Sequence, residues 1–173
     1  MKVILVGYRA SGKSTVGKLV SDRLRWPLWD IDCGIERKSG MTLTELYQRA
    51  GENRYRQVES EVVAEMCAND SCVIAFGAGT VMQPRNERIA GVDSLVVYLK
   101  LSAEQLWQRI DADPKSSTTR PNLSSGGLEE VVEMLARRTP TYERCANITL
   151  DGELAPGRLA DKIVERVNQL AGS

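Results

Sequence analysis

The stretch VILVGYRASGKST, residues 3–15, joins an apolar run to a glycine-rich turn that is followed by a lysine and two hydroxyl side chains. It matches the spacing G-x-x-x-x-G-K-[ST], with a strand-like segment before the turn and an amphipathic helix after it. The backbone N–H groups of such a turn, with the positive end of the following helix, surround a phosphate. We therefore predict a nucleotide site formed by Gly7, Ala10, Ser11, Gly12, Lys13, Ser14 and Thr15.

Lys13 and Ser14 give this turn its chemistry. A lysine at this position neutralises the β and γ oxygens of a nucleotide, and the adjoining hydroxyl is a ligand for Mg²⁺. Ala10 stands where a third glycine is common, which narrows the backbone freedom of the turn but keeps its N–H group. The alternative is a glycine-rich connection between a strand and a helix whose lysine is only solvated.

Apolar runs rich in β-branched residues predict strands at residues 3–6, 28–31, 72–76, 95–101 and 147–150. Longer stretches with helical periodicity separate these runs. The alternation of strands and helices predicts an α/β fold with a parallel sheet that is covered on both faces. Two capping boxes, which begin at Thr42 and Ser102, predict helices near 43–50 and 103–112.

Composition limits the class of protein. The 173 residues suffice for one domain and include 23 basic and 23 acidic side chains, so no global field attracts nucleic acid or an anionic membrane. Histidine is absent, which excludes His-based catalytic triads and most zinc sites. No charged leader precedes the first strand, and no apolar run reaches the roughly 18 residues that span a bilayer. We expect a cytoplasmic monomer with free thiols that binds neither nucleic acid nor membrane.

One long segment lacks apolar anchors. Residues 111–127, DADPKSSTTRPNLSSGG, are rich in Ser, Thr, Pro and Gly, and helix and strand patterns resume after them. We predict a mobile lid that closes over the nucleotide and brings Arg120 onto its phosphates. A plain surface loop is the alternative.

Other segments must identify the group that receives the phosphate. No N-K-x-D guanine reader is present, which argues against a GTPase. Asp30 and Asp32 lie at the carboxyl end of the second predicted strand, the edge where open α/β sheets hold ligands. Two residues apart, they should point to the same side of an extended chain, so that one serves the metal and the other a substrate hydroxyl. Turn-forming aspartates are the alternative.

Two arginines indicate an acidic acceptor. Glu52, Arg56 and Glu59 fall in one sector of a helix beside its apolar stripe, which places them on a pocket wall. A surface ion pair between Arg56 and Glu59 is the alternative. Arg138 continues the apolar stripe of a helix that Pro140 should break or kink, and a buried guanidinium demands an anion. With the aspartates and a glycine-rich turn, this favours a small polyhydroxylated acid as acceptor.

These residues resemble the shikimate kinase family. The pattern is carried by Gly7 to Thr15, DID at 30–32, GENRYR at 51–56 with Glu59, the glycine turn at 77–79, RPNL at 120–123 and RTPTY at 138–142. The blocks follow in order and at compatible spacing over nearly the whole chain. Many families share the first block, but the combination of the others is specific.

The resemblance implies a three-layer P-loop kinase fold with a central five-stranded parallel sheet flanked by helices. It also implies transfer of the γ-phosphoryl group of ATP to the 3-hydroxyl of shikimate, with Mg²⁺. We expect a substrate-binding region at about 32–60, with a pocket that closes over the acidic substrate around residues 34–60. By matching positions, the residues that hold shikimate are Asp32, Arg56, Gly77, Ala78, Gly79 and Arg138.

The resemblance further implies individual roles. Asp32 orients or deprotonates the attacking hydroxyl, Asp30 reaches Mg²⁺ through water, and Lys13 and Arg120 stabilise charge on the moving phosphoryl group. Glu59 resembles the family residue that steadies the substrate-binding arginine. The residues that resemble an adenine site are Arg109 and the segment from Glu153 to Pro156.

Two kinds of departure accompany the resemblance. The family's glycine turn usually has three glycines, and here Ala78 takes the middle place, which should lower substrate affinity. Tyr55 stands for a phenylalanine and Asn122 for a leucine, and neither changes a charged position. The rival interpretations are a P-loop kinase for another small hydroxy acid such as gluconate or for a nucleoside monophosphate, and a non-catalytic ATP-binding regulatory module.

Overall fold

The computed structural model describes residues 1–113 and 127–172. One five-stranded sheet organises them, in the order β2-β3-β1-β4-β5, and all four strand pairs are parallel. The predicted strands are all present, and their ends differ from the prediction by at most one residue. The strands are β1 (Lys2–Val6), β2 (Leu28–Asp30), β3 (Val73–Ala75), β4 (Ser94–Lys100) and β5 (Ile148–Asp151).

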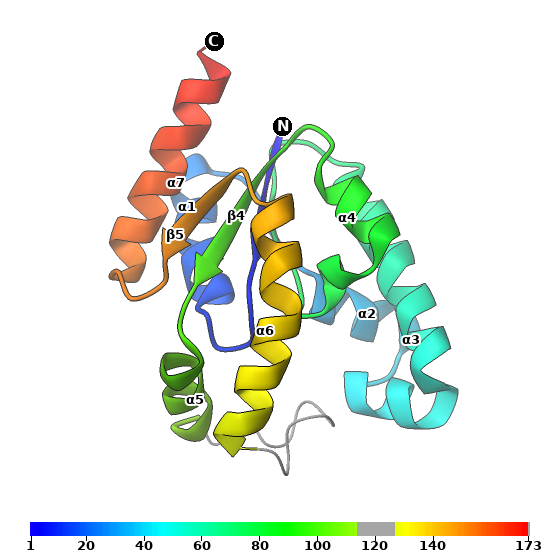
Figure 1. Ribbon diagram of the computed structural model, residues 1–173. Helices are drawn as coiled ribbons and strands as arrows, with labels where there is room; N and C mark the ends of the chain where they lie inside the picture. The colour runs from blue at the N-terminus through cyan, green and yellow to red at the C-terminus, as the bar shows by residue number, and fades with distance from the viewer. Residues whose placement is uncertain (114–126, 173) are drawn as a thin grey trace.

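Helices cover both faces of the sheet, which confirms the three-layer α/β fold (Figure 1). Helices α1 and α7 pack on one face, and α2, α3, α4 and α6 pack on the other. The bounds are α1 (Lys13–Leu24), α2 (Ile31–Ser39), α3 (Leu43–Cys67), η1 (Thr80–Met82), α4 (Pro84–Ala90), α5 (Ala103–Asp111), α6 (Gly127–Cys145) and α7 (Pro156–Ala171).

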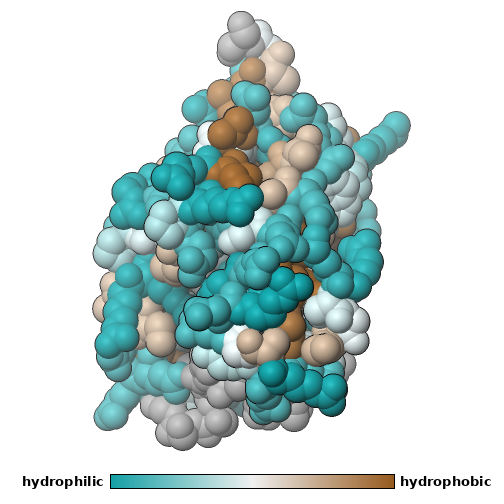
Figure 2. Space-filling model, turned by 90° about the vertical axis from the view of Figure 1, so that its right-hand side faces the viewer, coloured by the Kyte–Doolittle hydropathy of each residue, from teal (hydrophilic) through white to brown (hydrophobic). Residues whose placement is uncertain are grey.

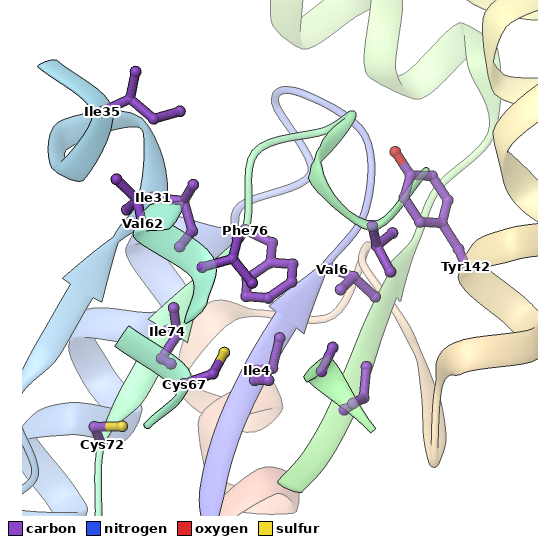
Figure 3. Close-up of a cluster of buried hydrophobic side chains, with 14 of the residues drawn as sticks. Ile4, Val6, Ile31, Ile35, Val62, Cys67, Cys72, Ile74, Phe76 and Tyr142 are labelled. Atoms are coloured by element: carbon purple, nitrogen blue, oxygen red, sulfur yellow. The ribbon is translucent and has the colours of Figure 1, made fainter. Parts of the chain in front are cut away.

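The central strand β1 shows how the sheet serves two cores. Successive side chains of a strand point to opposite faces, and every residue of β1 is buried. Ile4 and Val6 pack toward α2, α3 and α6, in the cluster of buried side chains that Figure 3 shows. Val3 and Leu5 pack toward α1 and α7. Burial on both faces explains why this strand is a continuous apolar run without alternation.

Side chains at their first turns fix two helices as predicted. Thr42 Oγ1 accepts a hydrogen bond from the Glu45 N–H at 3.2 Å, and Glu45 accepts from the Thr42 N–H at 3.0 Å. The same reciprocal pair starts α5 at Ser102. Helix α3 extends well past the predicted end at residue 50, but Gly51, with φ 76° and ψ 171°, interrupts it and separates two helical segments.

One local expectation is wrong. The second strand stops at Asp30 and the chain turns at once into α2, so Asp32 lies in a helix and not in an extended chain. Of the two outcomes expected at Pro140, a break is excluded, because helix α6 continues through Pro140 to Cys145, and a kink stays a prediction. A proline removes one helical hydrogen bond, but Tyr142 just beyond it is fully buried and anchors the last turn to the core.

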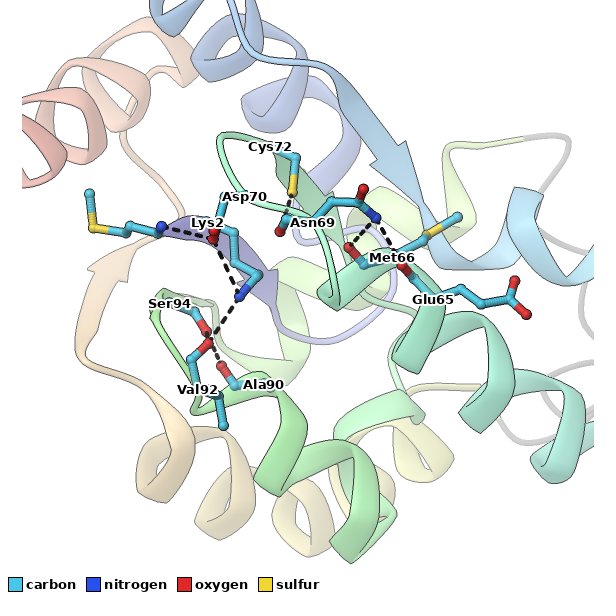
Figure 4. Close-up of polar contacts among 10 residues, drawn as sticks. Lys2, Glu65, Met66, Asn69, Asp70, Cys72, Ala90, Val92 and Ser94 are labelled. Atoms are coloured by element: carbon cyan, nitrogen blue, oxygen red, sulfur yellow. Dashed lines mark hydrogen bonds and ion pairs between the residues drawn. The ribbon is translucent and has the colours of Figure 1, made fainter.

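The amino ends of the strands are joined by polar contacts (Figure 4). Lys2 is 4% exposed, donates to the Val92 carbonyl at 3.1 Å and lies 4.0 Å from the Asp70 carboxylate. The outer face shown in Figure 2 is mostly hydrophilic. In the described ranges no helix has the length and apolar character needed to cross a membrane. The carboxyl ends of the strands point toward α5 and the start of α6 (Figure 1).

Candidate active site

The predicted phosphate turn has the conformation that its sequence requires. Gly12 caps α1 with φ 94° and ψ 10°, a left-handed conformation that suits glycine. Lys13 begins the helix, and its ammonium folds back into the turn, donating to the Gly7 carbonyl at 2.9 Å and the Tyr8 carbonyl at 2.7 Å. The turn therefore holds a positive charge beside the exposed N–H groups at the start of a helix, as a phosphate site needs.

A cavity lies against this turn, and we call it the phosphate cavity. Its described lining residues are Arg9, Ala10, Gly12, Lys13, Ser14, Thr15, Asp30, Asp32, Ala75, Phe76 and Asp113. Ser14 and Asp30, the two predicted metal residues, thus face the same space. Within the described ranges no group of three or more Cys, Asp or Glu side chains gathers as a metal cage.

The aspartate pair reaches this cavity by a different route from the one predicted. Asp30 is the last residue of β2 and caps α2, where its carboxylate accepts from the Cys33 N–H at 3.3 Å. Asp32 is in the first turn of α2. The switch from strand to helix, and not the alternation of an extended chain, turns both carboxylates toward the carboxyl edge of the sheet.

A second cavity, which we call the acid cavity, adjoins the first. The predicted substrate residues Asp32, Arg56, Gly77, Ala78, Gly79 and Arg138 all line it. Its other described lining residues are Tyr8, Arg9, Leu43, Tyr47, Tyr55, Glu59, Glu130 and Met134. Helices α3 and α6 thus bring two arginines to a cavity that Asp32 also lines.

Arg56 is held by a buried carboxylate. Its Nη1 donates to Glu59 Oε2 at 2.9 Å, and Thr80 donates its hydroxyl proton to the other oxygen of Glu59 at 2.9 Å. Glu59 is 1% exposed, so the alternative of a surface ion pair is wrong. Glu52, 3.6 Å from Arg56 Nε, is the more exposed partner. A buried, fully engaged carboxylate fixes the direction of the guanidinium fork.

Arg138 is positioned by aromatic residues. Its guanidinium carbon lies 5.5 Å from the ring centroid of Tyr8, within the range of a cation–π contact. One turn further along α6, the hydroxyl of Tyr142 donates to the Ala78 carbonyl at 2.5 Å. Burial raises the pKa of Tyr142 far above its ordinary value, so the phenol stays protonated and remains a donor.

The glycine turn at residues 77–79 lies close to the side chains of Asp32 and Arg56. A Cβ atom on Gly77 would stand 2.7 Å from Asp32 Oδ1, and one on Gly79 would stand 3.3 Å from Arg56 Nη1. A side chain at residue 77 would therefore displace the aspartate. Ala78 is 5% exposed and is accommodated between these two positions. Whether its methyl group lowers substrate affinity stays a prediction.

A third cavity lies on the other side of the phosphate turn, at the predicted adenine site. Arg109 donates to the Gly152 carbonyl at 3.0 Å and to the Ala10 carbonyl at 3.4 Å, which ties α5 to the turn. The described lining residues are Ala10, Ser11, Gly12, Thr15, Val16, Arg109, Gly152, Glu153, Leu154, Ala155, Pro156 and Leu159. Arg120 and nearly all of the predicted lid lie outside the described residues.

Sequence reasoning missed several residues of the site. Tyr8 and Arg9 occupy variable positions of the phosphate motif, Thr80 follows the glycine turn, and Tyr142 belongs to the block RTPTY without a role predicted for it. A signal existed for Arg9, because it is a charged residue inside a turn that surrounds a ligand. Nothing in the spacing identified Thr80 as a partner of Glu59, which is 21 residues away.

Comparisons with known proteins agree with this geometry. The family model for shikimate kinase matches residues 9–168. A shikimate kinase of Thermodesulfovibrio yellowstonii is 33% identical over 171 residues, covering 98% of this chain and 96% of that protein. One of Pseudomonas fluorescens is 35% identical over 170 residues, covering 97% and 96%. The solved structure of shikimate kinase from Acinetobacter baumannii in complex with shikimate has a TM-score of 0.89 at 29% identity, covering 97% of this chain and 93% of that one.

Proposed function

This chain belongs to the shikimate kinase family, and on that premise we propose that its two adjoining cavities transfer the γ-phosphoryl group of ATP to the 3-hydroxyl of shikimate. The products are shikimate 3-phosphate and ADP. The protein is an ATP-dependent phosphotransferase. The assignment of each residue to a step of this reaction is our proposal.

One observation carries the assignment: Asp32 lines both the phosphate cavity and the acid cavity. Phosphoryl transfer requires the donor and the acceptor oxygen to meet in line, with a group that accepts the hydroxyl proton nearby. A carboxylate at the junction can accept that proton as the acceptor oxygen attacks. Asp32 is therefore assigned as the residue that orients and deprotonates the 3-hydroxyl.

The two arginines of the acid cavity are assigned to the substrate carboxylate. A planar guanidinium offers two parallel N–H donors, which match the two oxygens of a carboxylate. Arg56 is oriented by Glu59, and Arg138 by the ring of Tyr8. Because the arginines hold the substrate carboxylate rigidly, they fix which hydroxyl of the acid faces the phosphate cavity. This determines which hydroxyl receives the phosphoryl group.

On the donor side, Lys13 and the turn around it are assigned to the β and γ phosphates. Ser14 and Asp30 are assigned to Mg²⁺, the first through its hydroxyl and the second through water. Two oxygen-bearing side chains beside a phosphate site suit Mg²⁺, which keeps most of its waters and binds through few protein ligands. When bound, the metal neutralises charge on the transferred group.

Three expectations rest on the sequence alone: that Arg120 contacts the phosphates, that a lid closes over the nucleotide, and that the enzyme is a cytoplasmic monomer.

The decisive experiment couples ADP formation to an acceptor screen. We expect ADP release with shikimate and none above background with gluconate or a nucleoside monophosphate. Arg56→Lys and Arg138→Lys should each raise the KM for shikimate by about 10-fold or more, because a lysine cannot reproduce a bidentate fork worth roughly 1.5–3 kcal/mol.

Arg137→Lys is the matched control. Arg137 adjoins Arg138 on α6 but pairs with Glu133 in solvent, its side chain being 68% exposed. The KM of the Arg137→Lys variant for shikimate should stay within about twofold of that of the parent. Normal ATP affinity without turnover on any acceptor would favour a regulatory module, and unchanged KM values in both active-site variants would contradict the carboxylate clamp.

A further inference from the structure

Arg9 occupies a special place between the two cavities. Of the residues that the structure describes, only Arg9 and Asp32 line both the phosphate cavity and the acid cavity. Arg9 occupies a variable position of the phosphate motif. Arg9 is 9% exposed and its Nε atom is buried, so most of this residue lies inside the molecule.

The other cations of the site lie to either side of this junction. The ammonium of Lys13 is bound to the carbonyls of Gly7 and Tyr8 on the phosphate side. Arg56 and Arg138 line the acid cavity but not the phosphate cavity. Negative charge on the transferred group must pass from one cavity to the other, and among these four cations only Arg9 lines both.

We infer that the guanidinium of Arg9 contacts the phosphoryl group as it moves and then binds the 3-phosphate of the product. This inference rests on the proposed function. In the step itself, the bond between the γ-phosphorus and the bridging oxygen of ADP breaks, the bond from phosphorus to the acceptor oxygen forms, and Asp32 takes the hydroxyl proton. Arg9 exchanges no proton, because arginine stays charged in proteins, and stabilises the oxygens around phosphorus through its N–H groups.

A purely structural role for Arg9 is the competing explanation. The carboxylates of Asp30, Asp32 and Asp113 also line the phosphate cavity, and an arginine that only held Asp32 in place would also keep the site intact. The two roles predict different effects on the affinities for shikimate and for shikimate 3-phosphate. A residue that only positions Asp32 affects shikimate and shikimate 3-phosphate alike, whereas a residue that contacts the phosphoryl group favours the phosphorylated compound.

The test measures two properties of Arg9→Met and Arg9→Lys. Steady-state kinetics should show kcat reduced roughly 100-fold in Arg9→Met, with the KM for shikimate within about threefold of the parent. Calorimetric titration should show the affinity for shikimate 3-phosphate reduced about 10-fold or more and that for shikimate within about threefold. Arg9→Lys keeps the charge and carries the test if Arg9→Met does not fold.

Arg37→Met is the control, because Arg37 is exposed on α2 and lines neither cavity. It should leave kcat and both affinities within about twofold of the parent. Equal losses of affinity for shikimate and its 3-phosphate, or an unchanged kcat in folded Arg9 variants, would overturn the inference while the proposed function stands. No shikimate-dependent ADP formation by the parent enzyme would overturn the proposed function, and this inference with it.

Discussion

Replacing Glu59 by glutamine changes one charge in the wall of the acid cavity and almost nothing in side-chain volume. The parent carboxylate accepts from Arg56 and from Thr80, both at 2.9 Å, and its side chain is 2% exposed. The amide oxygen of glutamine can keep one of these bonds. The amide N–H₂ must then occupy the other position, where it either opposes the guanidinium donors of Arg56 or donates to the hydroxyl oxygen of Thr80, whose own proton then loses its acceptor.

The magnitude follows from these contacts. A hydrogen bond to a charged group contributes about 1.5–3 kcal/mol, whereas a neutral one contributes about 0.5–1.5 kcal/mol. The side chain of Arg56 is 27% exposed and keeps Glu52 as a second partner at 3.6 Å, which softens the loss. We expect Glu59→Gln to lower the free energy of unfolding by about 2 kcal/mol, or the melting temperature by about 4–8 °C for a domain of this size.

Activity should suffer more than stability, because Arg56 loses the group that directs it. A shift of about 1 Å in a positioning group costs on the order of 100-fold, so we expect kcat/KM for shikimate to fall by about that factor while the KM for ATP changes little. Circular dichroism melting and the coupled ADP assay measure the two effects. Glu65→Gln is the matched control, since Glu65 also pairs with a cation, Lys38, but is 64% exposed. Its melting temperature should stay within about 2 °C of the parent.

The reasoning is refuted if Glu59→Gln melts within about 2 °C of the parent and keeps kcat/KM for shikimate within about threefold. That result would mean that solvent or Glu52 holds Arg56 in place, and that the buried carboxylate contributes nothing to its orientation. A large loss of stability with unchanged kcat/KM would locate the role of Glu59 in folding alone.

Two further predictions concern backbone strain and pH. Ala10 has φ 61°, a conformation that costs a residue with a Cβ roughly 1 kcal/mol. Ala10→Gly should therefore raise the melting temperature by about 2 °C without changing the affinity for ATP, whereas the control Ala64→Gly, inside α3, should lower the melting temperature. Changes of equal sign in the two variants would contradict the strain at Ala10. Burial raises the pKa of the Cys67 and Cys145 thiols from 9.0 to about 11, so the unfolded chain loses these protons first and the free energy of unfolding should fall as the pH rises from about 9 to about 11. In urea titrations over this pH interval, the free energy of unfolding of Cys67→Ala should fall less than that of the parent. Equal falls would contradict a raised pKa at Cys67.

The sequence by itself determined the features that neighbouring residues control. The phosphate turn is set by Gly12, which takes the left-handed conformation before the helix, and by Lys13 directly after it. Helix α3 starts where Thr42 and its capping partner predict, because a cap acts over three residues. The five strands follow from apolar runs that burial on both faces requires. Family motifs added the substrate and the identity of most site residues.

Only the tertiary structure decided what lies opposite each of these residues. Helical periodicity placed Glu59 beside the apolar stripe, but its buried carboxylate accepts a hydrogen bond from Thr80, which another segment supplies 21 residues later. Tyr142 binds a carbonyl 64 residues away, at Ala78. The position of Arg9 at the junction of two cavities likewise requires α2, α3 and α6 to be in place. Periodicity fixes the direction of a side chain along its own element, whereas its partners depend on how distant elements pack, and no local pattern contains that information.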